Sequence, residues 1–454
     1  MLQGRKYLVV GLGRSGIAAA KALIGLRADV TIQDKKRSEE LDGSLIQYFK
    51  NHDVTCCFGR DLKPDARYDT VVMSPGISPL LPFVMEAQAN GAEVISELEL
   101  AFRLGRGQYA AITGTNGKTT TTTLVGEIFK EAGLRTEVVG NIGVPVISKS
   151  IGAAEDTWFV TEVSSFQLEI AETFRPRISA LLNLTPDHLD RHKTMERYAQ
   201  AKANVFRNQG PEDYFIVNRD DAACWQLAED CRAAVFAFSR TQRLAQGAYV
   251  EGETIVVADK SGCIHEICGV RELQIPGAHN LENALAASAI AFCAGVVPAA
   301  IASVLRKFAG VEHRLELCGI VDGVRYINDS KGTNPDSSIK ALEAMTTPVL
   351  LIAGGYDKKS AYDEFVRAFG GRVRKLLLLG ATAAAIGEAA LAQGYAEEDI
   401  LRCRDMDECV KRAAQLAEAG DTVLLSPACA SWDMYDSYEQ RGRHFKDCVR
   451  NLQS

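Results

Sequence analysis

The sequence lacks any long hydrophobic run, any excess of positive charge and any secretory leader. The apolar residues before Gly11 are too few for a signal peptide, and the apolar stretch Ala284–Val297 is too short to span a membrane. A formal net charge of −7 disfavours nucleic acid and anionic membranes as partners. We expect a cytoplasmic monomer that acts on small molecules, without nucleic acid and without membrane insertion.

The twelve cysteines also lack the paired spacing of a metal site or a disulfide framework. They stand singly, apart from Cys56–Cys57, and no CxxC pair occurs. Isolated cysteines in a chain without a secretory leader are typical of reduced, mostly buried thiols. The sequence therefore predicts neither disulfides nor a zinc site.

What the chain does contain is a regular alternation of apolar, strand-like runs with helical segments. This alternation is typical of α/β domains built on largely parallel sheets, and a length of 454 residues allows several of them. The pattern divides into three blocks, 1–96, 97–309 and 310–454. The predicted strands are Tyr7–Val10, Val30–Gln33, Thr70–Met73, Tyr109–Ile112, Phe159–Glu162, Ala180–Asn183, Phe215–Asn218, Pro348–Ala353, Lys375–Leu379 and Thr422–Leu425.

A glycine-rich loop at Thr113–Thr120, reading TGTNGKTT, lies between the strand Tyr109–Ile112 and a helical segment. This order of strand, glycine loop and helix places backbone N–H groups around phosphate oxygens. Lys118 is expected to reach the β- and γ-phosphates, and the Thr119 hydroxyl to bind Mg²⁺. The general motif has glycine where this chain has Ile112, so the loop belongs to a variant class. The alternative, a turn with an exposed lysine, is disfavoured by the position of the loop.

A second glycine loop, Gly11–Gly16, reads GLGRSG and is followed by Asp34 at the end of the next strand. This spacing fits a dinucleotide fingerprint, in which the acid binds a ribose. However, the block ends near residue 96 and is too short for a six-stranded dinucleotide domain. A mononucleotide diphosphate such as a UDP-sugar would use the same loop, and tight strand–helix packing would also explain the glycines. A further loop, Ser74–Ile77, is predicted at the same sheet edge.

Polar side chains follow two strands of the middle block. Glu162 ends one strand, and His188 follows the next. Ligands bind beyond the carboxyl ends of parallel strands, so both side chains are expected near the phosphates of the Thr113–Thr120 loop. A carboxylate there can bind the Mg²⁺ of a nucleotide. Lys202 lies on the following helix and, taken alone, is expected to be an exposed surface lysine.

Taken together, these segments and several later ones resemble the Mur ligases. The residues that carry the resemblance are TGTNGKTT, Glu162–Gln167, Asp187–Asp190, Lys202, Gly277–Asn280, Asn283, Glu312–Arg314, Asn328–Lys331 and Ser426–Ser431. They occur in order across all three blocks. The segments GLGRSG, SPGIS, GNIG, SPACASWDMY and EQRG are similar to those of the family member that adds D-glutamate to UDP-N-acetylmuramoyl-L-alanine.

The resemblance implies three α/β domains: a Rossmann-like UDP-binding domain (1–96), a central P-loop ATPase-type domain (97–309) and a Rossmann-like domain that binds the amino acid (310–454). It implies an ATP-dependent amide ligase of peptidoglycan precursor synthesis. The substrate carboxylate would take the γ-phosphoryl group of ATP, and the amine of D-glutamate would attack the acyl phosphate. The implied cofactors are ATP, two Mg²⁺ ions and a Lys202 carbamylated by CO₂.

The resemblance also implies four groups of site residues. Catalysis and metal binding would involve Lys118, Thr119, Glu162, His188 and Lys202. ATP would bind to Gly114, Thr115, Asn116, Gly117, Lys118, Thr119, Thr120, Asn280, Asn283, Arg314, Asp329 and Lys331. The UDP substrate would bind to Arg14, Ser15, Asp34, Lys35, Lys36, Gly76, Asn141 and His188. D-glutamate would bind to Lys331, Thr333, Lys358, Ser431 and Tyr438.

Three other functions fit parts of the sequence. Another ligase of the same family would add a different amino acid or a dipeptide, or glutamate to folate. An NAD-dependent dehydrogenase would explain GLGRSG and Asp34 but would leave the second phosphate loop without a role. A nucleotide-sensing regulator or scaffold would not need a lysine, a carboxylate and a histidine together beside that loop.

Overall fold

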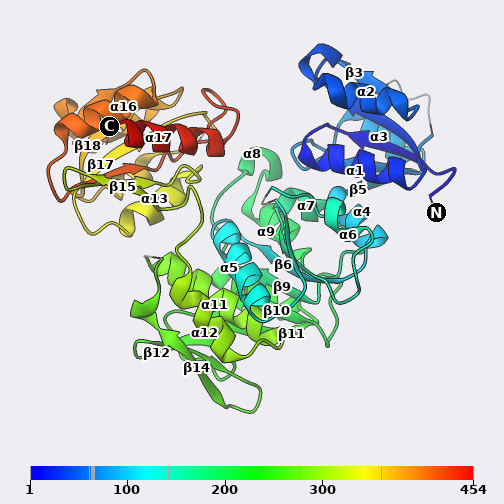
Figure 1. Cartoon of the computed structure of the whole chain (residues 1–454), viewed down its shortest axis with the longest axis horizontal. Coiled ribbons are helices and arrows are strands. Elements are labelled where there is room, and N and C mark those ends of the chain that lie inside the picture. Colours follow the sequence, from blue (N-terminus) through cyan, green and yellow to red (C-terminus); the bar gives the residue numbers. More distant parts are fainter. Residues whose placement is uncertain are drawn as a thin grey trace. The chain divides into compact units, whose positions relative to one another are not determined.

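The computed structural model describes residues 2–60, 62, 67–141, 143–275, 277–358 and 360–452, with the backbone alone for residue 190. It contains three β-sheets with helices packed against them (Figure 1), which confirms the predicted α/β class. The chain forms two compact units, Met1–Glu272 with Glu282–Arg306, and Leu273–Leu281 with Lys307–Ser454. The first unit holds two of the sheets and the second holds one. Among the described residues, no helix has both the length and the apolar content needed to cross a bilayer.

The N-terminal sheet has five parallel strands in the order β3-β2-β1-β4-β5. Its strands are β1 (Lys6–Val10), β2 (Asp29–Asp34), β3 (Thr55–Phe58), β4 (Thr70–Met73) and β5 (Glu93–Ser96), and its helices are α1 (Arg14–Gly25), α2 (Gly43–Asn51), α3 (Pro82–Ala89) and α4 (Glu97–Leu104). The central strands β1 and β4 are almost entirely apolar over their buried length, with Thr70 at the start of β4 the exception, because a parallel sheet is covered on both faces. Five strands agree with the expectation that this block is too short for a six-stranded dinucleotide domain.

Close packing of α1 on β1 explains two glycines of the GLGRSG loop. Gly11 has a φ of +87°, a backbone conformation that favours glycine. A Cβ atom at Gly16 would lie 1.8 Å from the carbonyl oxygen of Gly11, so any side chain there would push α1 away from the strand. These two glycines are therefore needed by the fold itself, whichever ligand the loop binds.

The central sheet has nine strands in the order β14-β13-β12-β11-β10-β9-β6-β8-β7. Its strands are β6 (Gln108–Thr113), β7 (Thr136–Gly140), β8 (Trp158–Glu162), β9 (Ile178–Leu181), β10 (Tyr214–Asn218), β11 (Ala234–Ser239), β12 (Gly247–Glu251), β13 (Thr254–Ala258) and β14 (Ile264–Gly269). Its helices are α5 (Lys118–Glu131), α6 (Ile147–Ser150), α7 (Ser165–Glu169), α8 (Leu189–His192), α9 (Met195–Ala203), α10 (Ala222–Leu227), α11 (Ala278–Cys293) and α12 (Pro298–Lys307). Strands β6 to β12 pair in parallel, so the carboxyl ends of β6, β8 and β9 meet at one edge.

The C-terminal sheet has six strands in the order β15-β16-β20-β17-β18-β19. Its strands are β15 (Glu316–Val321), β16 (Val324–Asn328), β17 (Val349–Ala353), β18 (Val373–Leu378), β19 (Ile400–Arg402) and β20 (Thr422–Leu425), and its helices are α13 (Pro335–Glu343), α14 (Asp363–Arg367), α15 (Ala383–Ala392), α16 (Met406–Leu416) and α17 (Tyr438–Leu452). Strand β15 pairs antiparallel with β16, and the other neighbouring strands pair in parallel.

All ten predicted strands are present, with ends that differ by one or two residues. Strand β9 was predicted to reach Asn183 but ends at Leu181. Asn183 leaves the strand because its side-chain oxygen accepts a hydrogen bond from the backbone N–H of Asn116 (2.8 Å). This position thus belongs to the neighbouring glycine loop rather than to the sheet.

A buried carboxyl group joins α4 to α6. Glu97 begins α4, is completely buried, and accepts a hydrogen bond from the backbone N–H of Ile147 in α6 (2.7 Å). Burial raises the pKa of Glu97 to about 7, although this backbone hydrogen bond acts in the opposite direction. The folded state therefore holds this proton more tightly than the unfolded state, and the resulting stabilisation is lost as the pH rises through about 7.

We expect Glu97→Gln to raise the melting temperature above that of the wild-type chain, by an amount that grows between about pH 5 and about pH 8. Glutamine keeps the hydrogen-bond acceptor but never carries a charge. Thermal unfolding followed by circular dichroism at several pH values measures the difference. The control is Glu86→Gln, at an exposed position of α3, for which the difference should not change with pH. A pH-independent difference for Glu97→Gln as well would contradict this account.

Candidate active site

The glycine loop between β6 and α5 is held in shape by bonds from Lys118 to the loop's own carbonyls and by a bond to the segment after β9. Gly117 precedes α5 in the left-handed region (φ +81°), and no described side chain caps this helix. The Lys118 ammonium group donates to the backbone carbonyls of Gly114 (2.9 Å) and Thr115 (2.7 Å). The Thr115 hydroxyl donates to the carbonyl of Thr185 (3.1 Å). The start of α5 with a lysine beside it is a site for phosphate groups.

A hydroxyl group and a carboxylate lie side by side at the carboxyl ends of β6 and β8. The Thr119 hydroxyl donates to Oε2 of Glu162 (2.7 Å), and the side-chain amide of Asn141 donates to Oε1 (2.9 Å). Glu162 is only 2% exposed. Oxygen ligands of this kind are the ones that Mg²⁺ prefers, so the residues present fit a nucleotide-bound magnesium ion. The contact between Asn141 and Glu162 was not expected from the sequence, which assigned Asn141 to the UDP substrate alone.

The expectation that Lys202 taken alone is an exposed surface lysine is wrong. Lys202 is 1% exposed on α9, and its Nζ donates to the carbonyl of Gly114 (2.8 Å), the same carbonyl that accepts from Lys118. Burial, followed by the charge of Lys118, lowers the pKa of Lys202 well below its ordinary value. The structure therefore places a buried amine, rather than an exposed one, against the phosphate loop.

Two histidines near this loop have different surroundings. His188 precedes α8 with a φ of +53°, its side chain is 34% exposed, and its Nε2 lies 3.5 Å from a carboxylate oxygen of Asp187. His192 is buried, and its Nε2 lies 2.9 Å from the Ser165 hydroxyl. Both rings contact Phe166: the His188 ring lies edge to face with ring centres 4.8 Å apart, and the His192 ring is stacked with ring centres 5.4 Å apart. His188 can reach a ligand at the loop, whereas His192 is part of the packing.

The two asparagines expected at the adenine fall in different compact units. Asn283 belongs to the first unit, where its side-chain oxygen accepts from the Thr121 hydroxyl (3.2 Å). A Cβ atom at Gly117 would lie 2.3 Å from that oxygen, so Asn283 packs directly on the phosphate loop. Asn280 belongs to the second unit and is buried at the start of α11.

Most of the residues expected to bind the UDP substrate lie at the carboxyl edge of the N-terminal sheet, whereas Asn141 and His188 belong to the central domain. Both carboxylate oxygens of Asp34 accept backbone hydrogen bonds, from Leu12 (2.6 Å) and Lys36 (2.8 Å), so this acid fixes the glycine loop. Arg14 begins α1 and lines a cavity of about 720 Å³ with Gly143 of the loop after β7. Ser15 is half-buried in the first turn of α1, and Lys35 and Gly76 are exposed in the loops after β2 and β4.

In the second unit, a buried carboxyl group lies at the carboxyl end of β16. Asp329 accepts a hydrogen bond from the Ser426 hydroxyl (2.8 Å), and burial raises the pKa of Asp329 to about 6 against the opposing charge of Arg314. The Nε of Arg314 is itself buried without a hydrogen-bond acceptor among the described residues. An unmet guanidinium donor of this kind is costly unless an anion reaches it, which fits a site for a phosphate or carboxylate group.

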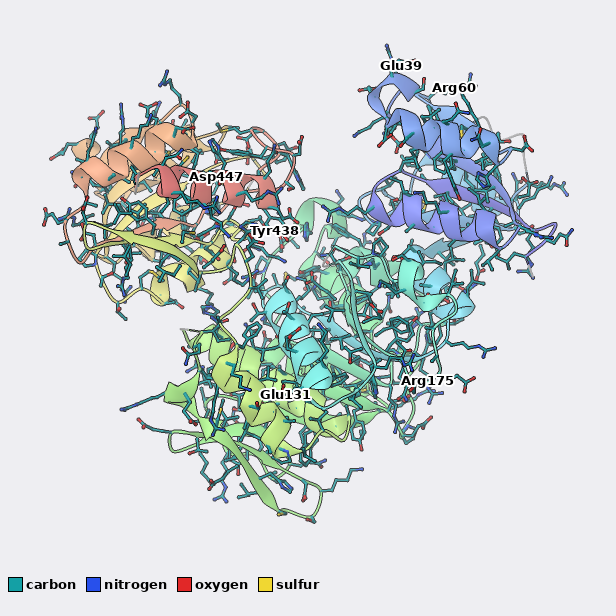
Figure 2. All side chains as sticks on the ribbon, in the orientation of Figure 1. Glu39, Arg60, Glu131, Arg175, Tyr438 and Asp447 are labelled. Carbon is teal, nitrogen blue, oxygen red and sulfur yellow. The ribbon has the colours of Figure 1, made fainter. Side chains whose placement is uncertain are left out.

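The same unit brings together the residues expected to bind D-glutamate. Lys331 Nζ lies 5.1 Å from the ring centre of Tyr438, which is labelled in Figure 2 and begins α17. Ser431 is buried after β20, and the N–H of Thr333 donates to the carbonyl of Lys331 (2.9 Å). Lys358 lies with its Nζ 6.0 Å from the ring centre of Trp432, next in sequence to Ser431. The segments that follow β16, β17 and β20 thus supply two ammonium groups, from Lys331 and Lys358, and two hydroxyl groups, from Thr333 and Ser431.

One residue of this unit was not predicted as part of the site. Arg441 of α17 is 2% exposed and donates to the hydroxyl and carbonyl oxygens of Ser330 (3.0 and 2.8 Å) and to the carbonyls of Cys429 (3.1 Å) and Ala430 (3.2 Å). It therefore joins the segment after β16 to the segment after β20. The signal in the sequence was an arginine four residues before Phe445, on the stripe of α17 that is otherwise apolar and buried.

Comparison with known proteins agrees with this arrangement along the whole chain. The family models that match are described as Mur ligase MurD-like, N-terminal domain (residues 5–96), Mur ligase middle domain (112–291) and Mur ligase, glutamate ligase domain (313–429). The UDP-N-acetylmuramoylalanine–D-glutamate ligase of Thermoanaerobacter sp. (strain X514) is 48% identical over 452 residues, which cover 99% of each chain. The protein of the same name from Clostridioides difficile (strain 630) is 46% identical, also over 99% of each chain.

Solved structures agree with the fold. The UDP-N-acetylmuramate-alanine ligase of Thermotoga maritima superposes with a TM-score of 0.61 at 18% identity and covers 98% of this chain and 99% of its own. The pseudomurein peptide ligase type C of Methanothermus fervidus gives a TM-score of 0.61 at 18% identity, with 99% of this chain and all of its own covered. With its full-length relatives and its three matched domains, the chain belongs to the Mur ligase family.

Proposed function

We propose that the chain is an ATP-dependent ligase that adds D-glutamate to UDP-N-acetylmuramoyl-L-alanine in the synthesis of peptidoglycan precursors. The observation that carries this proposal is the convergence of Lys118, Thr119, Glu162 and Lys202 around the Gly114 loop. A nucleotide-binding module alone has no need of a buried lysine against that loop. The full-length similarity to ligases of this name supports the choice of substrates.

Each of the three domains would bind a different substrate. The domain 1–96 would hold the UDP group at the ends of β1, β2 and β4, the domain 97–309 would hold ATP, and the domain 310–454 would hold D-glutamate near Lys331, Thr333, Lys358, Ser431 and Tyr438. Arg314, Asp329 and Asn280 would contact ATP from the second compact unit, since their charges and amide groups fit phosphates, ribose and adenine. The ligase would act in the cytoplasm as a monomer.

The reaction would begin with attack by a carboxylate oxygen of the L-alanyl group on the γ-phosphorus of ATP. A carbon–oxygen–phosphorus link forms, the bond to the β-phosphate oxygen breaks, and ADP leaves. The amine of D-glutamate then attacks the acyl carbon, loses a proton, and expels inorganic phosphate as the amide forms. Lys118 and the backbone N–H groups of α5 would position the transferring group and offset its charge.

Two Mg²⁺ ions would be held by Thr119, Glu162, His188 and a carbamylated Lys202. When bound, they would neutralise the charge of the phosphates and of the substrate carboxylate. The chain's own contribution is to hold the metal ligands in place. The side chain of Asn141 donates a hydrogen bond to one oxygen of Glu162. The carboxylate of Asp187 accepts a hydrogen bond from the backbone N–H of His188 (2.9 Å).

The buried Lys202 is suited to react with CO₂. Carbamylation requires an amine without its extra proton, and the lowered pKa of Lys202 favours that form. In the reaction the amine nitrogen bonds to the carbon of CO₂ and a proton is released, which leaves a carbamate anion. That anion would place a negative charge beside the Lys118 ammonium group at Gly114 and supply an oxygen ligand for a metal ion.

The alternative functions are less well supported. A dehydrogenase would need a six-stranded dinucleotide domain, whereas the N-terminal sheet has five strands. Another ligase of the family would differ in its amino-acid site, and the relatives found at 45 to 49% identity share the D-glutamate name. A regulator without activity would not explain a buried lysine at the phosphate loop.

Purified protein with ATP, Mg²⁺, UDP-N-acetylmuramoyl-L-alanine and D-glutamate should release phosphate at a rate that requires both the acceptor and the amino acid. The amine is needed to discharge the acyl phosphate, so omission of D-glutamate stops turnover. A coupled phosphate assay measures this. Release that is indifferent to D-glutamate, or greater with L-lysine or diaminopimelate, would overturn the proposed substrate.

Lys202→Ala should lower kcat by at least about a hundredfold, because a metal ligand is lost. In carbon-13 bicarbonate, the wild-type chain should show a carbamate signal by NMR that the variant lacks. The matched control is Lys130→Ala, which removes a half-exposed lysine from α5 and should keep both the signal and the rate. If the wild-type chain shows no carbamate and Lys202→Ala keeps its rate, the proposed role of Lys202 is wrong.

Arg441→Lys should lower kcat/KM for D-glutamate about tenfold or more, because lysine cannot make the four hydrogen bonds that join Ser330 to the Cys429–Ala430 segment. The KM for the UDP substrate should change by less than about twofold, since the first domain would bind it. Steady-state kinetics with each substrate varied separately measure the difference. Arg443→Lys, on an exposed position of the same helix, is the control. Equal losses for both substrates would contradict a positioning role at the D-glutamate site.

A further inference from the structure

The hairpin formed by β13 and β14 carries three metal-binding side chain types on one face. In its register Val257 lies opposite His265, and two residues further on the N–H of Asp259 donates to the carbonyl of Cys263 (3.0 Å). Alternate side chains of a strand point to the same face. Asp259, Cys263 and His265 therefore share one face of the hairpin at its turn.

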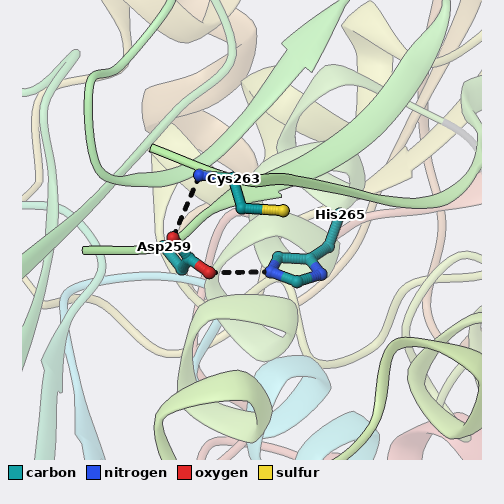
Figure 3. Close-up of side chains that lie close together, drawn as sticks. All are labelled: Asp259, Cys263 and His265. Carbon is teal, nitrogen blue, oxygen red and sulfur yellow. Dashed lines mark hydrogen bonds and ion pairs between the residues drawn. The ribbon is translucent and has the colours of Figure 1, made fainter. Parts of the chain in front are cut away.

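The ligand atoms of these three side chains already lie close together. All of them are within 4.8 Å of one another, and Oδ2 of Asp259 lies 3.0 Å from Nε2 of His265. Tetrahedral zinc with bonds of about 2.0 Å to oxygen and nitrogen and about 2.3 Å to sulfur separates its ligands by roughly 3.3 to 3.6 Å. Figure 3 shows the sulfur of Cys263 pointing toward the gap between Asp259 and His265. A metal ion could replace the proton between Asp259 and His265 with only small movements of the side chains.

The hairpin turn holds the carboxylate in place for a metal ion. Oδ1 of Asp259 accepts from the Ser261 hydroxyl (2.7 Å) and from the backbone N–H groups of Ser261 (2.8 Å) and Cys263 (3.0 Å), which leaves Oδ2 facing His265. These bonds, led by those from Ser261 and His265, hold the pKa of Asp259 well below its usual range. The His265 ring is supported by Phe292, with ring centres 5.2 Å apart. Ligands fixed by outer contacts of this kind bind metals more tightly.

We propose that Asp259, Cys263 and His265 bind a zinc ion, with the fourth position left to water. Oxygen, nitrogen and sulfur together suit zinc, whereas magnesium and calcium take oxygen ligands. Asp259 also lines a cavity of about 470 Å³ beside Tyr214 and Lys260. The sequence expectation of no zinc site rested on the lack of paired cysteines, and this site uses a single cysteine.

Two other clusters of possible ligands are less open to a metal ion. In the Asp407–His444–Cys448 cluster the thiol is buried and donates to Asp407, and the second ring nitrogen of His444 contacts Tyr435 (3.0 Å). The Glu312–His313–Glu316 cluster has no sulfur, and Lys446 pairs with both of its carboxylates. Cys263, in contrast, is exposed.

The proposed zinc site is separate from the phosphate loop. Strands β12, β11, β10 and β9 lie between β13 and β6 in the sheet. At about 4.8 Å per strand, the hairpin lies roughly 20 Å or more from the Gly114 loop. Zinc bound there would not take part in the ligase reaction, and its binding can be followed without measuring activity.

The test uses Co²⁺ as a coloured substitute for zinc on the full-length, reduced chain with Mg²⁺ in excess. Wild-type protein should bind one Co²⁺ with a thiolate-to-cobalt absorption band, and Zn²⁺ should displace it. Cys263→Ser should lose the band, and His265→Gln should bind Zn²⁺ about tenfold or more weakly in competition with a chromophoric chelator. Cys231→Ser, which removes a half-buried cysteine outside the three clusters, is the matched control and should behave as wild type.

A band that persists in Cys263→Ser, or that is lost in Cys448→Ser instead, would overturn the proposal, and so would the absence of a thiolate band in the wild-type chain. Because Cys263 is exposed, its replacement should leave the melting temperature of the metal-free protein unchanged, and this measurement separates loss of the ligand from loss of the fold. Added Zn²⁺ should raise the melting temperature of the wild-type chain but not that of Cys263→Ser.

Discussion

Two lysines donate to one backbone carbonyl, that of Gly114, and much of the central domain depends on this contact. Lys118 and Lys202 approach it at 2.9 and 2.8 Å, one from the phosphate loop and one from α9. Two positive charges so close together in a buried place would repel strongly, and burial followed by the charge of Lys118 lowers the pKa of Lys202 well below its ordinary value. The loop thus has one lysine suited to phosphate groups and a second, buried lysine whose lowered pKa favours the reactive amine. A simple nucleotide-binding loop would need the first alone.

The surrounding fold keeps Lys118 and Lys202 in place beside the carbonyl of Gly114. The parallel pairing of β6 with β8 and β9 sets the Thr119 hydroxyl against Glu162, and the side chain of Asn183 fixes the loop from the end of β9. Glycine at position 117 lets Asn283 pack on the loop, where any Cβ atom would collide with its side-chain oxygen. In the second unit Arg441 joins the segment after β16 to the segment after β20 by hydrogen bonds to both. Both halves of the proposed site are therefore shaped by polar side chains that need not touch a substrate.

The sequence predicted the strands and the phosphate loop well, because apolar periodicity and glycine spacing are local properties. It predicted less of what depends on distant contacts. The burial of Lys202 follows from the packing of α9 on the loop, and a helical lysine carries no local sign of it. Arg441 has a local sign, its place on the apolar stripe of α17, but its partners lie some 110 residues earlier and about ten residues before it. The ligands of the hairpin come together only through the register of β13 with β14.

The central claim is that the Lys118–Lys202 site transfers a phosphoryl group to a carboxylate. It is tested most directly with UDP-N-acetylmuramoyl-L-alanine carrying oxygen-18 in its alanyl carboxylate. During turnover with ATP and D-glutamate, the phosphate released should carry one labelled oxygen, seen by its isotope shift in phosphorus NMR, because the carbon–oxygen bond of the acyl phosphate breaks when the amide forms. Unlabelled phosphate alongside normal amide formation would contradict the account.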